Sequence, residues 1–316
     1  MKRLIKAILR ELPYIKSLHR QIEKQGIYPA GHFCSPIPDK DEVLAYIDSR
    51  KPPKDELPGI DLHKEDQSVL LREYSQYYDE LPFPEKQEPG CRFYYDNPWY
   101  SYSDAIFLYG FLRKHRPRRI IEVGSGFSSA VILDTTERLF SRRPEITFVE
   151  PYPDRLKGLF KGHDENQVKI IEKKIQEVPS ELFSSLEAGD LLFIDSSHVV
   201  KCGSDLQLIL FDIMPLLPAG IFMHFHDIFY PFEYPSEWLK KGRYLNEDYF
   251  LRAFLSYNSE WIVYFFNTYL AFAFGDFIKE KMPLCAKNPG GSLYITKVRN
   301  TDFAVHEGVN GKGVLD

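Results

Sequence analysis

The sequence predicts an α/β protein whose main domain is a doubly wound sheet of seven strands, preceded by an extension of helices and loops. Two observations predict this fold. From residue 103 onward, short apolar segments alternate with longer helical patterns, which is typical of a parallel sheet covered by helices on both faces. The first apolar segment also runs directly into Gly124-Ser125-Gly126, where glycines let backbone amides approach a ligand closely.

The bulk composition is that of a globular enzyme and excludes some classes of partner. Of the 316 residues, 44% are hydrophobic and 27% are charged, and the formal net charge is -5. This charge provides no basic field for a nucleic-acid backbone, so we expect no nucleic-acid partner. The four cysteines are scattered without metal or redox spacing, and neither a secretory leader nor a membrane-spanning run is recognisable. We therefore expect a reduced, cytoplasmic protein.

Residues 1–97 are predicted to form the N-terminal extension, which covers the domain behind it or contacts another subunit. Helical patterns occupy residues 2–24, 40–49 and 64–78, with proline-rich and glycine-containing segments between and after them. The helix over residues 2–24 has one apolar face and one basic face, with Pro13 as a kink. Such a helix can lie on an anionic membrane surface, but packing on its own domain or on a partner subunit of a homo-oligomer is the favoured interpretation.

Residues 98–299 are predicted to form the main domain, and residues 300–316 a polar tail that contains glycine. The predicted strands occupy residues 119–123, 146–150, 168–172, 191–195, 220–225, 261–266 and 292–298. The predicted helices around them occupy residues 104–115, 127–140, 153–160, 205–216 and 246–258. Because ligands of a doubly wound sheet bind at the carboxyl ends of its strands, the residues that follow these strands are the candidates for a site.

The first two strand ends carry the features of a nucleoside-cofactor site. Glu122 lies two residues before Gly124, and Ser129 replaces the third glycine of the dinucleotide fingerprint. A carboxylate at that position does not favour a pyrophosphate, but it would attract a cofactor that bears an ammonium group. Glu150 ends the second strand, where an acidic side chain accepts hydrogen bonds from ribose hydroxyls. NAD-dependent enzymes share that last feature, so Glu150 indicates a nucleoside without saying which.

The fourth and fifth strand ends carry the candidate catalytic residues. Asp195 and His198 follow the fourth strand, and His226 and Asp227 follow the fifth. Together these side chains could deprotonate a hydroxyl group or hold a divalent cation. The aromatic-rich segment 229–238 leaves the same edge of the sheet, as a substrate lid would, or else serves as a packing loop or dimer contact.

These residues carry a family resemblance. The run Ile120-Ile121-Glu122-Val123-Gly124-Ser125-Gly126, together with Glu150 and the two later strand ends, resembles class I S-adenosylmethionine-dependent methyltransferases, which have a Rossmann-like fold. Within that superfamily, Ile194-Asp195-x-x-His198 and Gly220-x-x-x-His224-x-His226-Asp227 resemble a branch with sugar O-methyltransferases and cephalosporin-hydroxylase-like proteins. The resemblance covers roughly residues 100–298.

The resemblance implies roles for individual residues. The methionine end of the cofactor would be held by Glu122, Gly124, Ser125 and Gly126, the ribose by Glu150 and the adenine by Gln176, with Asp195 near the transferred methyl group. In metal-dependent relatives the acidic strand ends bind Mg²⁺, which implies a metal site at Asp195, His226 and Asp227. Because Mg²⁺ prefers oxygen ligands, the histidine at position 226 favours a metal-free mechanism in which a neutral His198 or His226 is the base.

The resemblance therefore implies an enzyme that transfers a methyl group from S-adenosylmethionine to a hydroxyl of a small sugar, glycan or natural-product-like acceptor. One alternative is a catalytically silent cofactor-binding or scaffold protein of a glycan pathway. A second alternative is an NAD-dependent oxidoreductase, which Glu122 and the missing third glycine oppose.

Overall fold

The computed structural model describes residues 12–24 and 26–299. Two compact units make up the chain, namely Met1–Pro53 with Tyr234–Leu245, and Lys54–Glu233 with Asn246–Asp316. Residues 54–97, which the sequence analysis assigned to the N-terminal extension, belong to the larger unit. The expected domain boundary at residue 97 therefore does not coincide with the division between the two compact units.

The smaller unit contains the described helices α2 (Pro13–Lys24), α3 (Lys40–Ser49) and α10 (Ser236–Lys240). The side chain of Asp39 caps α3 by accepting hydrogen bonds from the backbone amides of Asp41 and Glu42, at 2.8 and 3.2 Å. The guanidinium of Arg50 donates to the carbonyl oxygen of Tyr234 at 2.9 Å. This bond joins the two chain segments that form the unit.

The predicted N-terminal helix is described only in part. Pro13, expected as a kink inside it, is the first residue of α2, and residues 2–11 lie outside the described residues. Proline is favourable at a helix start because its missing amide hydrogen would have no helical partner there. Whether this helix packs on protein or lies on a membrane surface stays a prediction. No helix within residues 12–24 and 26–299 is long and apolar enough to cross a membrane.

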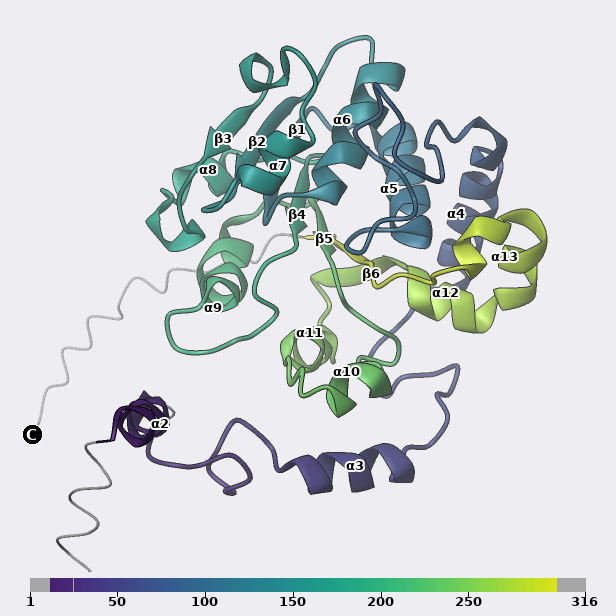
Figure 1. Cartoon of the computed structure of the whole chain (residues 1–316). Helices are drawn as coiled ribbons and strands as arrows, with labels where there is room; N and C mark the ends of the chain where they lie inside the picture. Colours follow the sequence, from purple (N-terminus) through teal and green to yellow (C-terminus); the bar gives the residue numbers. More distant parts are fainter. Residues whose placement is uncertain (1–11, 25, 300–316) are drawn as a thin grey trace, which may run out of the picture. The chain divides into compact units, whose positions relative to one another are not determined.

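The larger unit is built on a seven-stranded sheet in the order β3-β2-β1-β4-β5-β7-β6 (Figure 1). The strands are β1 (Arg119–Val123), β2 (Glu145–Val149), β3 (Lys169–Ile171), β4 (Leu191–Ile194), β5 (Phe222–Phe225), β6 (Trp261–Phe266) and β7 (Leu293–Lys297). The strand order reverses between β1 and β4, and this switch point is where a doubly wound sheet binds its ligand. The predicted fold class is confirmed, and each predicted strand is present.

The helices of the larger unit are α4 (Lys64–Ser75), α5 (Tyr102–His115), α6 (Phe127–Leu139), α7 (Asp154–Gly158), α8 (Glu181–Ser184), α9 (Asp205–Leu208), α11 (Glu247–Leu255), α12 (Asn267–Ala273) and α13 (Gly275–Lys281). Single turns of other helix types are η1 (Tyr78–Glu80), η2 (Asp164–Asn166), η3 (Ile175–Glu177), η4 (Ile209–Ile213), η5 (Met214–Leu216) and η6 (Pro283–Ala286). The helix predicted over 205–216 is present as a succession of α9, the π-helical turn η4 and the 3-10 turn η5.

One strand differs from the expected parallel arrangement. β7 pairs with β5 and with β6, and both pairings are antiparallel. The helices α12 and α13, which the sequence pattern did not predict, lie between β6 and β7 along the chain. Every residue of β7 is buried, as in a central parallel strand, so its hydrophobic pattern carries no information about its direction.

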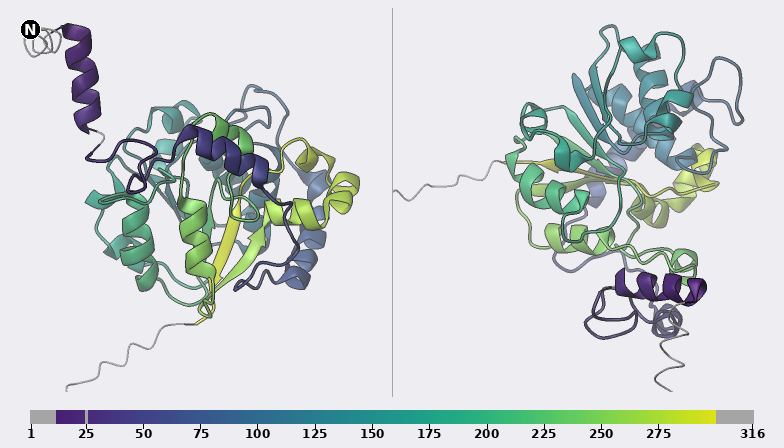
Figure 2. Two further views of the ribbon diagram at one scale, coloured as in Figure 1. Left: turned by 90° about the horizontal axis from the view of Figure 1, so that it is seen from below. Right: turned by 60° about the vertical axis from the view of Figure 1, so that its left-hand side comes forward.

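Side chains of each strand alternate between two cores, one on each face of the sheet. In β4, Leu192 and Ile194 belong to the cluster that also contains residues of α9 and α11, and Leu191 and Phe193 to the cluster that contains residues of α5 and α6. Figures 1 and 2 show these helices around the strands. Because burial of apolar surface stabilises by roughly 25 cal/mol per Å², this alternation fixes the register and with it the position of the polar residues at the strand ends.

A buried arginine holds the segment before α5 against the rest of the larger unit. The side chain of Arg92 donates two hydrogen bonds to Asp164, at 2.7 and 2.6 Å, and further bonds of 2.6 Å to Asp134 and Glu137. Asp134 also accepts hydrogen bonds from the backbone amides of Arg92 and Phe93. These contacts explain why residues of the expected extension pack as part of the sheet unit.

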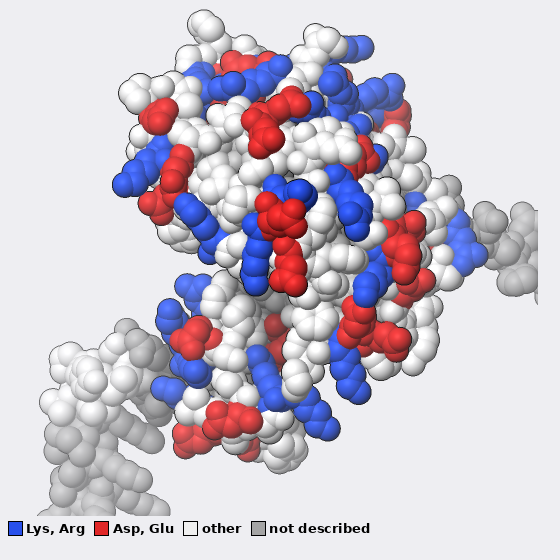
Figure 3. Space-filling view, turned by 90° about the vertical axis from the view of Figure 1, so that its right-hand side faces the viewer, with Lys and Arg blue, Asp and Glu red and all other residues white. Residues whose placement is uncertain are grey.

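Basic and acidic side chains are interspersed on the face of the molecule that Figure 3 shows. The surrounding white surface separates groups of both signs, and neither sign forms a continuous area there. That face therefore lacks the single-sign patch that a nucleic-acid backbone would require.

Replacing Arg92 should destabilise the fold strongly. In Arg92→Met the buried carboxylates of Asp134 and Asp164 lose the guanidinium and keep only their contacts with Lys161 and backbone amides, so we expect a loss of about 3–5 kcal/mol in the free energy of unfolding. Urea denaturation of the variant and the wild type measures this loss. The matched control is Arg113→Met, because Arg113 pairs with the exposed Glu80 and should cost less than about 1 kcal/mol. Equal losses in the two variants would contradict the prediction.

Candidate active site

The glycine-rich turn after β1 lies directly against the end of β4. Gly124 has a φ of +81°, and a Cβ atom there would lie only 1.6 Å from the carbonyl oxygen of Asp195. Only glycine fits this position, because both the backbone conformation and the close approach exclude a side chain. The turn and Asp195 are thus fixed against each other at the switch point of the sheet.

Glu122 positions the same turn through two serine hydroxyls. Its side chain is fully buried, and its two carboxylate oxygens accept hydrogen bonds of 2.5 Å from the hydroxyls of Ser128 and Ser129. Ser129 in turn accepts a hydrogen bond from the backbone amide of Gly126 at 3.0 Å. Burial raises the pKa of Glu122 to about 8, although the two serine hydrogen bonds oppose the shift. The implied contact of Glu122 with the cofactor's ammonium group stays a prediction, and the described contacts give it a role in positioning the turn.

Glu150 follows β2 and binds a backbone amide of the same turn. Its carboxylate accepts hydrogen bonds from the backbone amides of Ser125, at 2.9 Å, and Tyr152, at 2.8 Å. Its half-buried side chain also lines a cavity of 470 Å³ between the ends of β1, β2 and β4. The other lining residues are Val123, Gly124, Val149, Pro151, Tyr152, Lys174, Ile175, Gln176, Asp195, Ser196, Ser197, Lys201, Gly203, Ser204 and Asp205.

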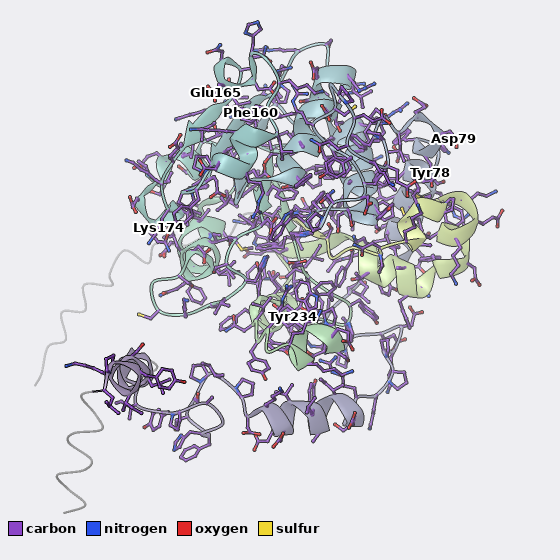
Figure 4. The ribbon with its side chains drawn as sticks, viewed as in Figure 1. Tyr78, Asp79, Phe160, Glu165, Lys174 and Tyr234 are labelled. Carbon is purple, nitrogen blue, oxygen red and sulfur yellow. The ribbon has the colours of Figure 1, made fainter. Side chains whose placement is uncertain are left out.

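Several polar groups of this region are suited to a nucleoside ligand. The side-chain amide of Gln176 donates to the carbonyl of Gly203 at 3.0 Å, which fixes it at the wall next to Lys174, labelled in Figure 4. The hydroxyls of Ser125 and Ser196 are buried and have no hydrogen-bond partner among the described residues. Buried polar groups are rarely left unpaired, so these hydroxyls are available to a polar ligand.

The candidate catalytic side chains converge beside this cavity, as the strand ends predicted. Nε2 of His198 lies 3.4 Å from Oδ1 of Asp195 and 3.6 Å from Oδ2 of Asp227. Nε2 of His226 lies 3.5 Å from Oδ1 of Asp227. The backbone of His198 (φ +57°) and of Asp227 (φ +58°) is left-handed, a conformation that residues other than glycine adopt uncommonly.

Glu247, at the start of α11, is a functional candidate that the sequence analysis missed. Its Oε2 lies 2.8 Å from Nδ1 of His198, and its side chain is buried. This contact orients the imidazole so that Nε2 faces Asp195 and Asp227. The only sequence signal was an acidic pair, Glu247-Asp248, at a helix start, where carboxylates are common for reasons of helix stability.

The groups around His198 oppose the neutral form expected of the base. Burial by itself would lower the pKa of His198, but the hydrogen bonds and charges of Asp195 and Glu247 raise it well above its ordinary value. Burial would also lower the pKa of His226, which the charges of Asp227 and Asp195 raise. Both imidazoles therefore keep their proton to higher pH than an ordinary histidine does, and either can accept a proton only in its unprotonated form.

The metal site that the family resemblance implied has no support in the geometry. Within residues 12–24 and 26–299 there is no group of three or more His, Cys, Asp or Glu side chains that could hold a metal ion. Asp195 and Asp227 instead face His198, and His226 is an imidazole where Mg²⁺ would prefer an oxygen. The residues present do not fit the ion.

A second cavity lies at the opposite edge of the sheet, near the amino ends of β1 and β2. It has a volume of 360 Å³ and is lined by residues 116–119 and 140–145. It contains none of the predicted site residues. The switch-point cavity therefore remains the candidate site.

These features define a class of protein. A doubly wound sheet with a glycine turn after β1, an acidic residue after β2 and a cavity at the switch point is typical of α/β proteins that bind a nucleoside-containing cofactor.

Comparisons with known proteins identify the family. A family model described as a methyltransferase domain matches residues 121–228. An uncharacterized protein of Archaeoglobus fulgidus is 36% identical over 179 residues, which cover 54% of this chain and 78% of that protein. The chain belongs to the class I S-adenosylmethionine-dependent methyltransferase family.

Solved structures with a similar fold include the S-adenosylhomocysteine-bound methyltransferase PaMTH1 of Podospora anserina, with 20% identity, coverage of 75% of this chain and 92% of that chain, and a TM-score of 0.37. The O-methyltransferase TomG of Streptomyces achromogenes, in complex with S-adenosylmethionine, matches with 12% identity, coverage of 82% and 96%, and a TM-score of 0.37. Because these scores are low, the family assignment depends on the sequence matches.

Placing a side chain at Gly124 should prevent stable folding. In Gly124→Ala the new Cβ would collide with the backbone of Asp195, so we expect a loss of at least about 4 kcal/mol in the free energy of unfolding. Chemical denaturation, or the yield of folded protein, measures the effect. In the control, Gly158→Ala in α7, the Cβ meets no atom within 4 Å, and stability should rise by about 0.5–1 kcal/mol. A folded Gly124→Ala protein of wild-type stability would contradict the observed contact.

Proposed function

We propose that this protein transfers a methyl group from S-adenosylmethionine to a hydroxyl oxygen of a small acceptor. The observation that carries the proposal is the position of His198, whose Nε2 faces Asp195 and Asp227 beside the switch-point cavity. The family resemblance favours a sugar, a glycan or a natural-product-like acceptor.

The cofactor would lie along the glycine-rich turn and in the cavity. Glu150 is positioned to accept hydrogen bonds from ribose hydroxyls, and Gln176 lies at the wall where the adenine would pack. The buried hydroxyls of Ser125 and Ser196 supply further hydrogen-bonding groups. Bound S-adenosylmethionine supplies a methyl group on a positively charged sulfur, which is open to direct displacement.

His198 would act as the general base toward the acceptor hydroxyl. Its side chain is 14% exposed and that of His226 is 5% exposed, so His198 is the more accessible of the two imidazoles. Glu247 fixes its ring through Nδ1, which leaves Nε2 to take the hydroxyl proton as the oxygen forms its new bond to carbon. Asp195 and Asp227 would orient the acceptor and stabilise the resulting imidazolium.

Methyl-donor turnover against a panel of sugar, glycan and natural-product hydroxyls tests the proposal, alongside calorimetric titration with S-adenosylhomocysteine and with NAD. We expect S-adenosylhomocysteine to bind, NAD not to bind, and at least one hydroxyl acceptor to be methylated. Binding without turnover on any acceptor class would favour the catalytically silent cofactor-binding protein. Binding of NAD alone would refute the proposal.

Glu150→Ala should weaken S-adenosylhomocysteine binding by about 1–3 kcal/mol, because a charge-assisted hydrogen bond to the ribose is lost. Isothermal titration calorimetry measures the affinity, and a thermal unfolding scan checks that the turn remains folded. Glu172→Ala is the matched control, since Glu172 follows β3 and pairs with Lys157 on the surface. An unchanged affinity in Glu150→Ala would refute the assignment of Glu150 as the residue that binds the ribose.

The rate should rise with pH. Because Asp195 and Glu247 raise the pKa of His198, the base is protonated and inactive below that pKa and becomes active as the pH rises through it. Glu247→Gln removes one of the charges that raise this pKa, so the rising limb of kcat/KM should move to lower pH. His198→Gln should lower the rate by about 10²–10⁴-fold, with S-adenosylhomocysteine affinity nearly unchanged.

An NMR titration of the His198 ring gives the same pKa without an acceptor. The control for this series is His163→Gln, because His163 is exposed and precedes η2, on the amino-terminal side of β3. A rate that is independent of pH, or a Glu247→Gln profile displaced to higher pH, would exclude His198 as the base.

A further inference from the structure

Arg155, in the first turn of α7, is an arginine without a carboxylate partner next to the glycine-rich turn. Its Cδ would lie 3.3 Å, and its Nη1 3.9 Å, from a Cβ atom built on Gly126. Its guanidinium forms no hydrogen bond or ion pair with any residue of the part of the chain that the structure describes. The five N–H donors of this exposed guanidinium are therefore available to a ligand next to the turn.

Trp99 holds this guanidinium in place. The Cζ atom of Arg155 lies 4.0 Å from the centre of the Trp99 ring, a cation–π geometry. The backbone of Trp99 is itself fixed, because its amide donates to Oδ1 of Asn97 at 3.0 Å. The Nδ2 of Asn97 donates to the carbonyl oxygens of Tyr94 and Tyr100, at 2.7 and 2.9 Å. Stacking on an aromatic ring orients the guanidinium plane and leaves its N–H groups at the edge free to donate.

The positive charge of Arg155 acts on the site. The pKa of Asp195 lies below its ordinary value: burial acts to raise it, but the charges of His226, His198 and Arg155 outweigh the burial. Arg155 lies against Gly126, and Gly124 in the same turn lies against the backbone of Asp195 at the end of β4. The helix α6, which follows Gly126, adds the partial positive charge of its amino end next to this turn.

We propose that Arg155, oriented by Trp99, binds the carboxylate of the amino-acid end of S-adenosylmethionine above Gly126. This inference rests on the proposed function. S-adenosylmethionine carries a sulfonium, an ammonium and a carboxylate, and a guanidinium attracts only the last of these. Arg155 presents planar N–H donors with the geometry that a carboxylate requires, and the missing side chain at Gly126 leaves room for the arginine side chain to lie against the turn.

The test compares two ligands that differ only in the carboxylate, S-adenosylmethionine and its decarboxylated form, by calorimetric titration of the full chain. Arg155→Met should weaken S-adenosylmethionine binding by about 10-fold to 100-fold, the effect of a lost charge-assisted pair. It should leave the affinity for decarboxylated S-adenosylmethionine unchanged. Arg155→Lys should lie between Arg155→Met and the wild type, and Trp99→Ala should produce a smaller loss that is again specific to the carboxylate-bearing ligand. Arg142→Met, at the opposite edge of the sheet, is the control and should bind both ligands as the wild type does.

Two results would overturn the inference. One is an Arg155→Met variant that binds S-adenosylmethionine as tightly as the wild type. The other is an equal loss of affinity for both ligands, which would mean that Arg155 supports the turn rather than the carboxylate. A wild-type protein that binds neither ligand would refute the proposed function itself, and the inference with it, so the two failures are distinguishable.

Discussion

The contact between Gly124 and the carbonyl oxygen of Asp195 is the constraint on which the rest of the site depends. It joins the ends of β1 and β4, the two strands between which the strand order reverses. Since no side chain separates them, the turn after β1 lies against the backbone at the end of β4. Glu122, through Ser129, and Glu150, through the amide of Ser125, fix that turn by hydrogen bonds. The polar groups at the strand ends are thereby fixed relative to one another before a ligand binds. A site prepared in this way loses little conformational entropy when it is occupied.

Charged side chains of the site lie next to one another. Nearby carboxylates raise the pKa of His198 and of His226, and burial raises the pKa of Asp227 in spite of those two histidines. In such a cluster the protonation of one side chain changes the pKa of the others. Under the proposed function, a positive charge brought next to Asp195 would compete with the imidazolium for that carboxylate and lower the pKa of His198. Occupation of the cofactor site and release of the proton from the base are then linked.

The sequence was informative wherever a local pattern determines the structure. Short apolar segments predicted the strands, and the residues that follow them, from Glu122 to Asp227, lie together as expected because strand ends meet at one edge. The direction of β7 was not predictable, since buried strands have the same pattern in either direction. The sequence did not indicate Glu247 or Arg155 as candidates, because their contacts are with residues distant in the chain, and an acid or arginine near a helix start is usually a surface group. The pKa of His198 depends both on the neighbouring Asp195 and on the distant Glu247.

The left-handed backbone at His198 and Asp227 has a consequence for how this protein has been selected. A residue other than glycine in that conformation costs of order 1–3 kcal/mol, and here two such residues face each other across 3.6 Å. Histidine and aspartate tolerate it better than most residues, but glycine at either position would relax the backbone. The chain therefore retains two side chains at places where their removal would ease the local conformation. Thermostability alone would favour their loss; under the proposed function, selection for stability and selection for activity would oppose each other at these two positions.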